Sequence, residues 1–171
     1  MSLPCSLLTL IINNHNLFEF YAKEQFAVKL TTKTRYGTRA MLEIARAYPD
    51  RSVKRKEISI TQEVSSAYLE NILTSLKEAG VITAQRGANG GFRLAQRPET
   101  ITLLQIITAL EGTIAPVDCA ENPESCGRSN CCTTFRVWQS FHTAQQKFFQ
   151  NITLRDLIEM GRSPDKFVCE I

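Results

Sequence analysis

Four cysteines lie within fourteen residues of one another in the second half of the chain: Cys119, Cys126, Cys131 and Cys132. Thiolates are soft, anionic donors that suit iron, iron–sulphur clusters and zinc. Disulfides explain this density poorly, because the neighbouring residues Cys131 and Cys132 can hardly bridge each other without strain, and a chain of this length does not need them. The cysteines therefore indicate a metal or iron–sulphur site.

Three interpretations of these thiols stay open from the residues alone. An iron–sulphur cluster is the favoured one, because several thiolates stand in one short loop. Zinc usually binds pairs of cysteines separated by two residues, and this loop lacks such a pair. The third interpretation is that the thiols respond to oxidation or have no chemical role.

The distribution of charge predicts a polyanionic partner for one part of the chain. Residues 31–97 hold twelve Lys or Arg and six Asp or Glu, a net charge of +6, whereas residues 98–171 hold six and nine, a net charge of −3. Nucleic acid is the natural partner of such a basic segment. A solvated basic face explains the charge alone equally well. The 43% apolar composition favours an ordinary core over disorder.

The first 27 residues fit the predicted fold poorly. The apolar run 7–12 has no basic residue before it, so it lacks the charged start of a signal peptide, and it is too short to cross a bilayer. We expect a cytoplasmic, bacterial protein without a membrane partner. One hypothesis is that the native chain begins at Val28. The alternative is a real, partly helical extension.

Apolar spacing predicts a helix-turn-helix in the basic segment. A helix is expected over residues 32–47 and a short one over 54–62. Ser65 or Ser66 can cap a third, which runs to about residue 79 and ends at Gly80. The polar face of this third helix could meet base edges and phosphates in a major groove.

A hairpin follows the predicted helix pair. Two short strands, residues 81–85 and 92–95, flank a turn that contains Asn89 and Gly90, a strong hairpin signal. Arg86 and Arg93 have no acidic neighbours in the sequence and suit a narrow minor groove. The hairpin would then be the wing of a winged helix. A purely structural hairpin is the alternative.

The rest of the chain is predicted to be helical. Thr102 caps a helix that runs to Glu111, residues 133–152 form a long helix, and Thr153 caps a final short one. The long helix carries an apolar stripe that one small domain cannot easily cover: Val137, Trp138, Phe141, Ala144, Phe148 and Ile152. We assign this stripe to dimer packing, with core packing as the alternative for Phe148 and Phe149.

Four motifs resemble the Rrf-two family of bacterial transcription regulators: LTTKTRYG at 30–37, SAYLE at 66–70, LKEAGV at 76–81 and RGANGGF at 86–92. The resemblance covers about residues 28–160. It implies a homodimer with a winged helix-turn-helix and a long crossing dimerisation helix. In cluster-binding members of the family, three cysteines stand in the loop before that helix.

The resemblance carries a DNA-binding set over to this chain. Tyr68 and Glu70 would lie on the recognition helix and Arg86 in the wing, and Glu70 matches a residue that tunes base choice. The full predicted set is Thr31, Lys33, Tyr36, Ser65, Ser66, Tyr68, Glu70, Asn71, Arg86, Asn89 and Gly90.

The resemblance also implies a 2Fe-2S cluster held by Cys119, Cys126 and Cys132, with Cys131 as a further candidate. At the positions where family members have their fourth ligand, this sequence departs from the family pattern. Phe135 stands where some members have a histidine, and Arg35 stands where others have an aspartate. Remaining candidates are an acid or a residue of the partner subunit; the acids are Asp118, Glu121 and Glu124. His142 is predicted to be exposed or packed rather than a ligand.

The sequence thus predicts a mostly α fold with a small two-stranded β-wing. The expected parts are an extension of doubtful status (1–27), a winged helix-turn-helix domain (28–98), a cysteine loop with the dimerisation helix (99–160) and a tail (161–171). The expected function is a homodimeric regulator of double-stranded operator DNA, not an enzyme, that senses iron–sulphur, redox or nitric oxide status. The alternative is a metal-free regulator controlled by an enzyme partner or by thiol oxidation.

Overall fold

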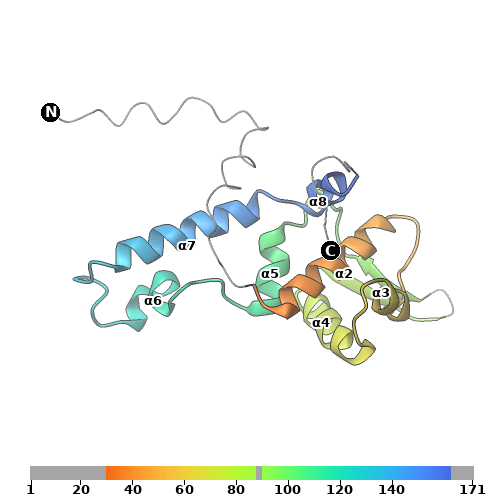
Figure 1. Ribbon diagram of the computed structural model, residues 1–171, viewed down its shortest axis with the longest axis horizontal. Coiled ribbons are helices and arrows are strands. Elements are labelled where there is room, and N and C mark those ends of the chain that lie inside the picture. The colour runs from red at the N-terminus through yellow and green to blue at the C-terminus, as the bar shows by residue number, and fades with distance from the viewer. Residues whose placement is uncertain (1–29, 88–89, 163–171) are drawn as a thin grey trace. The chain divides into compact units, whose positions relative to one another are not determined.

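The computed structural model describes residues 30–87 and 90–162, and these residues form a mostly helical fold with a two-stranded antiparallel sheet (Figure 1). Residues 1–27 and most of the predicted tail lie outside the described part. The helices and strands are α2 (Thr32–Arg46), α3 (Arg55–Thr61), α4 (Ser66–Glu78), β1 (Ile82–Gln85), β2 (Gly91–Leu94), α5 (Leu103–Glu111), α6 (Asp118–Glu121), a 3-10 helix (Pro123–Ser125), α7 (Phe135–Gln150) and α8 (Leu154–Met160).

Side-chain caps fix where several helices begin. The Ser65 hydroxyl accepts a hydrogen bond from the backbone N–H of Tyr68 at 3.3 Å, so Ser65, rather than Ser66, caps α4. Thr102 and Thr153 cap α5 and α8, as predicted, and each cap is a full capping box.

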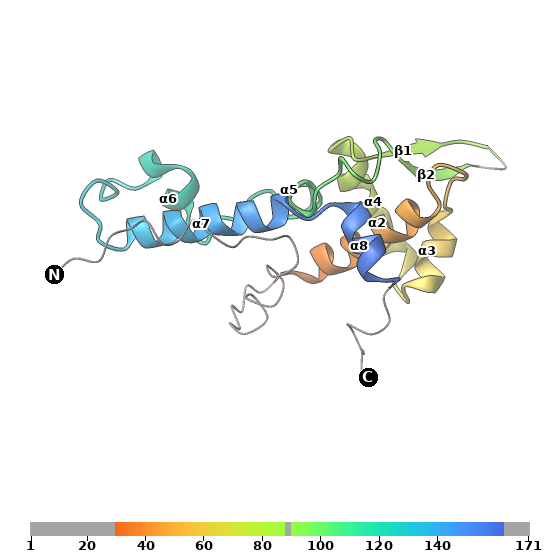
Figure 2. The same cartoon turned by 90° about the horizontal axis from the view of Figure 1, so that it is seen from above.

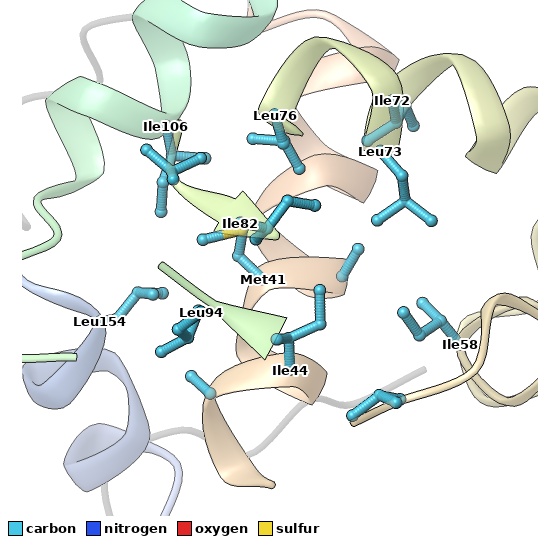
Figure 3. Packing of buried hydrophobic residues seen from close by; sticks show 14 of the residues in the cluster. Met41, Ile44, Ile58, Ile72, Leu73, Leu76, Ile82, Leu94, Ile106 and Leu154 are labelled. Atoms are coloured by element: carbon cyan, nitrogen blue, oxygen red, sulfur yellow. The ribbon is translucent and has the colours of Figure 1, made fainter. Parts of the chain in front are cut away.

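One apolar core joins the helix-turn-helix to the helices that follow the wing (Figure 3). Met41 of α2 and Leu76 of α4 are fully buried there. Ile106 of α5 and Leu154 of α8 belong to the same cluster, so the core extends beyond residue 98. The division of the chain at residue 98 stays a prediction.

The wing is a short hairpin attached to the core at its base. β1 pairs with β2 in a register that sets Ile82 opposite Leu94. Val53 extends the pairing, because its N–H donates to the Phe92 carbonyl at 2.9 Å and its carbonyl accepts from the Phe92 N–H at 2.8 Å. This bridge fastens the wing to the chain that leads into α3.

The cysteine loop and the long helix differ in detail from the prediction. The residues between the helix that ends at Glu111 and the predicted long helix contain α6 and the 3-10 helix, and α7 begins at Phe135 rather than at residue 133. Asp118 and Glu124 stand in the first turns of these short helices, where acidic side chains are favoured. Both α6 and α5 pack against α7 (Figure 2). No helix in residues 30–87 or 90–162 is long and apolar enough to traverse a bilayer.

Candidate nucleic-acid interface and cysteine segment

The exposed face of α4 has the polar character predicted for a recognition helix. Ser66, Glu70 and Asn71 are exposed on it, while Leu69 and Ile72 on the opposite face are buried. Glu70 forms an ion pair with Arg55 of α3. The carboxylate predicted to influence base choice is therefore paired with a cation of the preceding helix.

A cluster of aromatic rings and arginines lies beside this face. The rings of Tyr36 on α2 and Tyr68 on α4 meet edge to face, with centroids 6.3 Å apart. The guanidinium carbons of Arg35 and Arg39 lie 5.4 and 5.5 Å from the Tyr36 ring centroid. Such cation–π contacts hold the two arginines beside the exposed face of α4, where they could contact DNA phosphates.

Arg35 and Arg39 are not among the DNA-binding residues predicted from the sequence. Their spacing in the sequence could have indicated that they lie together, because residues four apart share one face of a helix. Arg39 also donates to the Gln62 side chain at the end of α3. Arg35 and Arg39 thereby lie against the ring of Tyr36, which in turn contacts the ring of Tyr68.

Two predicted DNA-binding residues have partners inside the fold instead. The Thr31 hydroxyl donates to the Glu111 carboxylate, and Lys33 Nζ donates to the Leu110 carbonyl at 2.6 Å. Both contacts join the start of α2 to the end of α5. A role for Thr31 or Lys33 at DNA stays a prediction.

The wing carries one arginine that is free to reach a partner. Arg86 is exposed and forms no ion pair with the described residues. Arg93 donates to the Pro49 carbonyl at 3.0 Å and lines a cavity together with Asp50 and Glu57, so it is not remote from acids as its sequence neighbours suggested.

The tip of the wing lies partly outside the described residues, and Asn89 is among those left out. Gly90 donates its N–H to the Gly87 carbonyl at 2.9 Å. A Cβ atom at Gly90 would lie only 2.4 Å from the Gln85 carbonyl oxygen. The turn itself therefore requires glycine at this position, whatever its role at DNA.

The four cysteines of the segment between α5 and α7 are all free thiols. Cys119 lies in α6, Cys126 follows the 3-10 helix and Cys132 precedes α7, and each of these three is half-buried. Cys131 is exposed, and its Sγ lies 3.5 Å from the Arg128 carbonyl oxygen.

Cys132 is predisposed to lose its proton. Its Sγ lies 3.2 Å from Thr134 Oγ1. The pKa of Cys132 lies below its usual value because the Thr134 hydroxyl and the backbone N–H groups of Thr134 and Phe135 hydrogen-bond to the sulphur. The thiolate is the form that binds metals.

The chemistry of the donors fits an iron–sulphur cluster, but the donors are not gathered at one point. Within residues 30–87 and 90–162, no three His, Cys, Asp or Glu side chains are close enough together to hold a metal ion. Three half-buried thiols, one of them with a lowered pKa, are the appropriate ligand type. Ligation by all three would require the segment to close around the metal.

His142 is packed, in agreement with one of the two predicted alternatives. Its side chain is 5% exposed, and its Nε2 has no hydrogen-bond partner. Phe135 and His142 are seven residues apart in α7, a rise of about 10 Å along the axis. This separation, together with the burial of its side chain, disfavours His142 as a ligand of a cluster held by Cys132.

The candidates for a fourth ligand have the following surroundings. Asp118, Glu121 and Glu124 are exposed, and Glu121 accepts a hydrogen bond from the Thr113 hydroxyl. Arg35 faces Tyr36, as described above. The fourth ligand thus stays a prediction.

A winged helix with an exposed polar recognition helix defines a class of DNA-binding transcription regulators. Residues 30–160 match the Rrf2 family, described as iron-dependent transcriptional regulators. The chain therefore belongs to the Rrf2 family, which is the Rrf-two family that its motifs resemble. The predicted family and the predicted winged-helix fold are both confirmed.

Relatives in the family are similar to this chain over most of its length. Protein rrf2 of Nitratidesulfovibrio vulgaris is 38% identical over 84% of this chain and 96% of its own length. The structure of CymR, the global cysteine regulator of B. subtilis, is 34% identical, with a TM-score of 0.64, over 78% of this chain and 98% of CymR. IscR of T. potens is 28% identical, with a TM-score of 0.66, over 83% of this chain and 93% of IscR.

Proposed function

We propose that this regulator works as a homodimer whose affinity for operator DNA responds to a 2Fe-2S cluster held by Cys119, Cys126 and Cys132. The observation that carries the proposal is a set of three free thiols on the segment that joins α5 to α7. The hydrogen bonds that lower the pKa of Cys132 favour the thiolate form that binds metals. A bound cluster would supply a redox-active, exchangeable centre at this segment.

The DNA-binding surface would consist of α4 and the wing. Ser66 and Asn71 are exposed on α4 and carry donors and acceptors that suit base edges in a major groove. Arg86 on the wing suits an adjacent minor groove or phosphate. Arg35 and Arg39, held over Tyr36, would contact the backbone. In the dimer, the two recognition helices must match half-sites about one turn of DNA apart.

Iron analysis of cysteine variants tests the cluster. The wild-type protein, purified without oxygen, is expected to be coloured and to contain about two irons and two sulphides per protomer. Replacing Cys119, Cys126 or Cys132 by alanine should each remove most of the iron, because every lost thiolate opens the cluster.

Cys131→Ala is the matched control, since Cys131 is an exposed thiol of the same segment. It should retain the iron and the visible absorbance. Loss of iron in this variant would make Cys131 the fourth ligand. A colourless, iron-free wild-type protein would overturn the cluster proposal.

Replacing Arg86 by alanine tests the wing. If Arg86 contacts phosphate, binding should weaken by about 1 kcal/mol for all sequences and lose part of its salt dependence. If it contacts a base, the variant should lose about 1–3 kcal/mol and relax its preference at one position of the operator. Gel shifts over a set of operator variants distinguish the two. Unchanged affinity together with unchanged sequence preference would exclude Arg86 from the interface.

A second candidate function is regulation without a metal, through an enzyme partner or thiol oxidation. Two observations favour it: the 34% identity to CymR, and the finding that no three possible metal donors come together among the described residues. In that case iron should be absent, and DNA binding should change on addition of a partner or an oxidant. The iron analysis above decides between the two candidates.

A further inference from the structure

The end of α5 is tied to the start of α2 by a small group of polar contacts. The Glu111 carboxylate accepts hydrogen bonds from the hydroxyls of Thr31 and Thr34, and both reach the same oxygen, Oε1. Lys33 Nζ donates to the Leu110 carbonyl at 2.6 Å. We call these five residues the α2–α5 junction. Thr34 is 1% exposed, so the junction continues into the core.

Both charges of the junction stand at favourable helix ends. Thr31 caps α2, and Glu111 places a negative charge at this N-terminal end. Lys33 places a positive charge at the C-terminal end of α5, where it satisfies a terminal carbonyl. Burial raises the pKa of Glu111, but hydrogen bonds from Thr31 and Thr34 and the charge of Lys33 outweigh it, so the pKa lies below its usual value. Glu111 is therefore held as a carboxylate.

The junction lies between the two parts of the molecule that the proposed function must connect. On one side, the cysteine segment begins one residue after Glu111, at Gly112, whose φ of 83° is left-handed and which has open space around its Cα. On the other side, the next turn of α2 carries Tyr36, which contacts Tyr68 of the recognition helix. A displacement of the cysteine segment would thus act first on Glu111.

We propose that the α2–α5 junction transmits the state of the cysteine segment to the DNA-binding surface, with Glu111 as the positioning residue. When the segment closes around a cluster, the pull on Gly112 changes the hydrogen bonds that Glu111 makes to Thr31 and Thr34. Because these bonds fix the start of α2, the position of Tyr36 against Tyr68 changes with them. This inference rests on the proposed function.

The test measures DNA affinity in two states of each variant. Cluster-loaded and cluster-free protein are compared by fluorescence anisotropy without oxygen, at one fixed salt concentration, on the DNA upstream of the gene. For a coupled regulator, the two wild-type affinities should differ by about 5–150-fold. In Glu111→Ala this ratio should fall to within about threefold, with unchanged iron per protomer. Lys33→Met, which keeps the aliphatic stem, should reduce the ratio in the same direction.

Two further variants separate positioning from general stability. Glu111→Gln keeps an oxygen that can accept from both hydroxyls, so it should restore part of the ratio. Glu159→Ala removes an exposed carboxylate elsewhere, one paired with Arg155 within α8, and should leave the wild-type ratio intact. Circular dichroism confirms that each variant is folded, and Lys33→Met carries the test if Glu111→Ala does not fold.

The outcomes distinguish this inference from the proposed function. If Glu111→Ala and Lys33→Met keep the wild-type ratio, the junction does not transmit the signal. If a variant that is folded loses its iron together with its DNA affinity, the junction is only structural and the inference is wrong. If the wild-type protein holds no cluster, or binds DNA equally in both states, the proposed function itself fails and the inference falls with it.

Discussion

Replacing Trp138 by aspartate is expected to convert dimers into monomers and to weaken operator binding by roughly a hundredfold or more. Trp138 is 40% exposed and Val137 is 59% exposed on α7, so a large apolar area faces solvent in the single chain. Tryptophan is the residue type that most often dominates an interface energetically. A carboxylate in its place would have to be buried without a partner. The loss of DNA affinity follows because one protomer can hold only one half-site.

Light scattering after gel filtration, together with gel shifts on a two-half-site operator, measures both effects. Gln146→Asp is the matched control, because Gln146 is exposed on the same helix outside the apolar stripe. It should remain dimeric and bind as the wild type does. Val137→Asp should reproduce the effect if Trp138→Asp alters the fold. Dimers that persist at micromolar concentration in both apolar-stripe variants would contradict the dimerisation role of α7.

Local sequence signals predict the helix-turn-helix and the wing well. Ser65, Thr102 and Thr153 act as caps because a cap depends on residues at most three positions away. Gly80, with φ 72°, ends the chain's predicted recognition helix for the same local reason. The hairpin also follows from its own residues, since the turn admits only glycine at position 90.

Contacts between residues distant in sequence could not be predicted in this way. In the sequence, Lys33 and Glu111 look like ordinary surface charges. In the fold, their hydrogen bonds join the start of α2 to the end of α5, and the bonded residues are 77 positions apart in the sequence. Arg93 has no acidic neighbours in the sequence. In the fold it donates a hydrogen bond to the Pro49 carbonyl and lines a cavity together with Asp50 and Glu57. Spacing along one chain carries no information on which side chains tertiary packing will bring together.

The cysteines are an intermediate case. Their type and spacing predict the kind of metal that they would bind, because donor softness is a property of the residues. In the proposed cluster their arrangement would depend on metal–ligand bonds, whose free energy is part of the folding free energy of such a segment. Sequence spacing therefore predicts Cys119, Cys126 and Cys132 as donors without giving their positions. It also does not predict α6, which packs against α7.

Gly37→Val is expected to lower the free energy of unfolding by about 3 kcal/mol, the upper end of the usual range for overpacking. Gly37 stands in the middle of α2, where glycine normally costs stability. A Cβ atom there would lie 2.3 Å from Leu110 Cδ1 and 3.4 Å from Ile72 Cγ2. Because both neighbours are buried, α2 can pack against α5 this closely only without a side chain at position 37.

Urea denaturation of matched variants measures this effect. Gly161→Val is the control, because a Cβ atom at Gly161 makes only ordinary contacts at 3.6 Å. The double variant Gly37→Val with Leu110→Ala should be more stable than the sum of the two single effects predicts, by about 1–3 kcal/mol, since the valine fills the space that Leu110 leaves. Additive effects would mean that the two residues do not compete for the same volume, and the close approach of α2 to α5 would then need another cause.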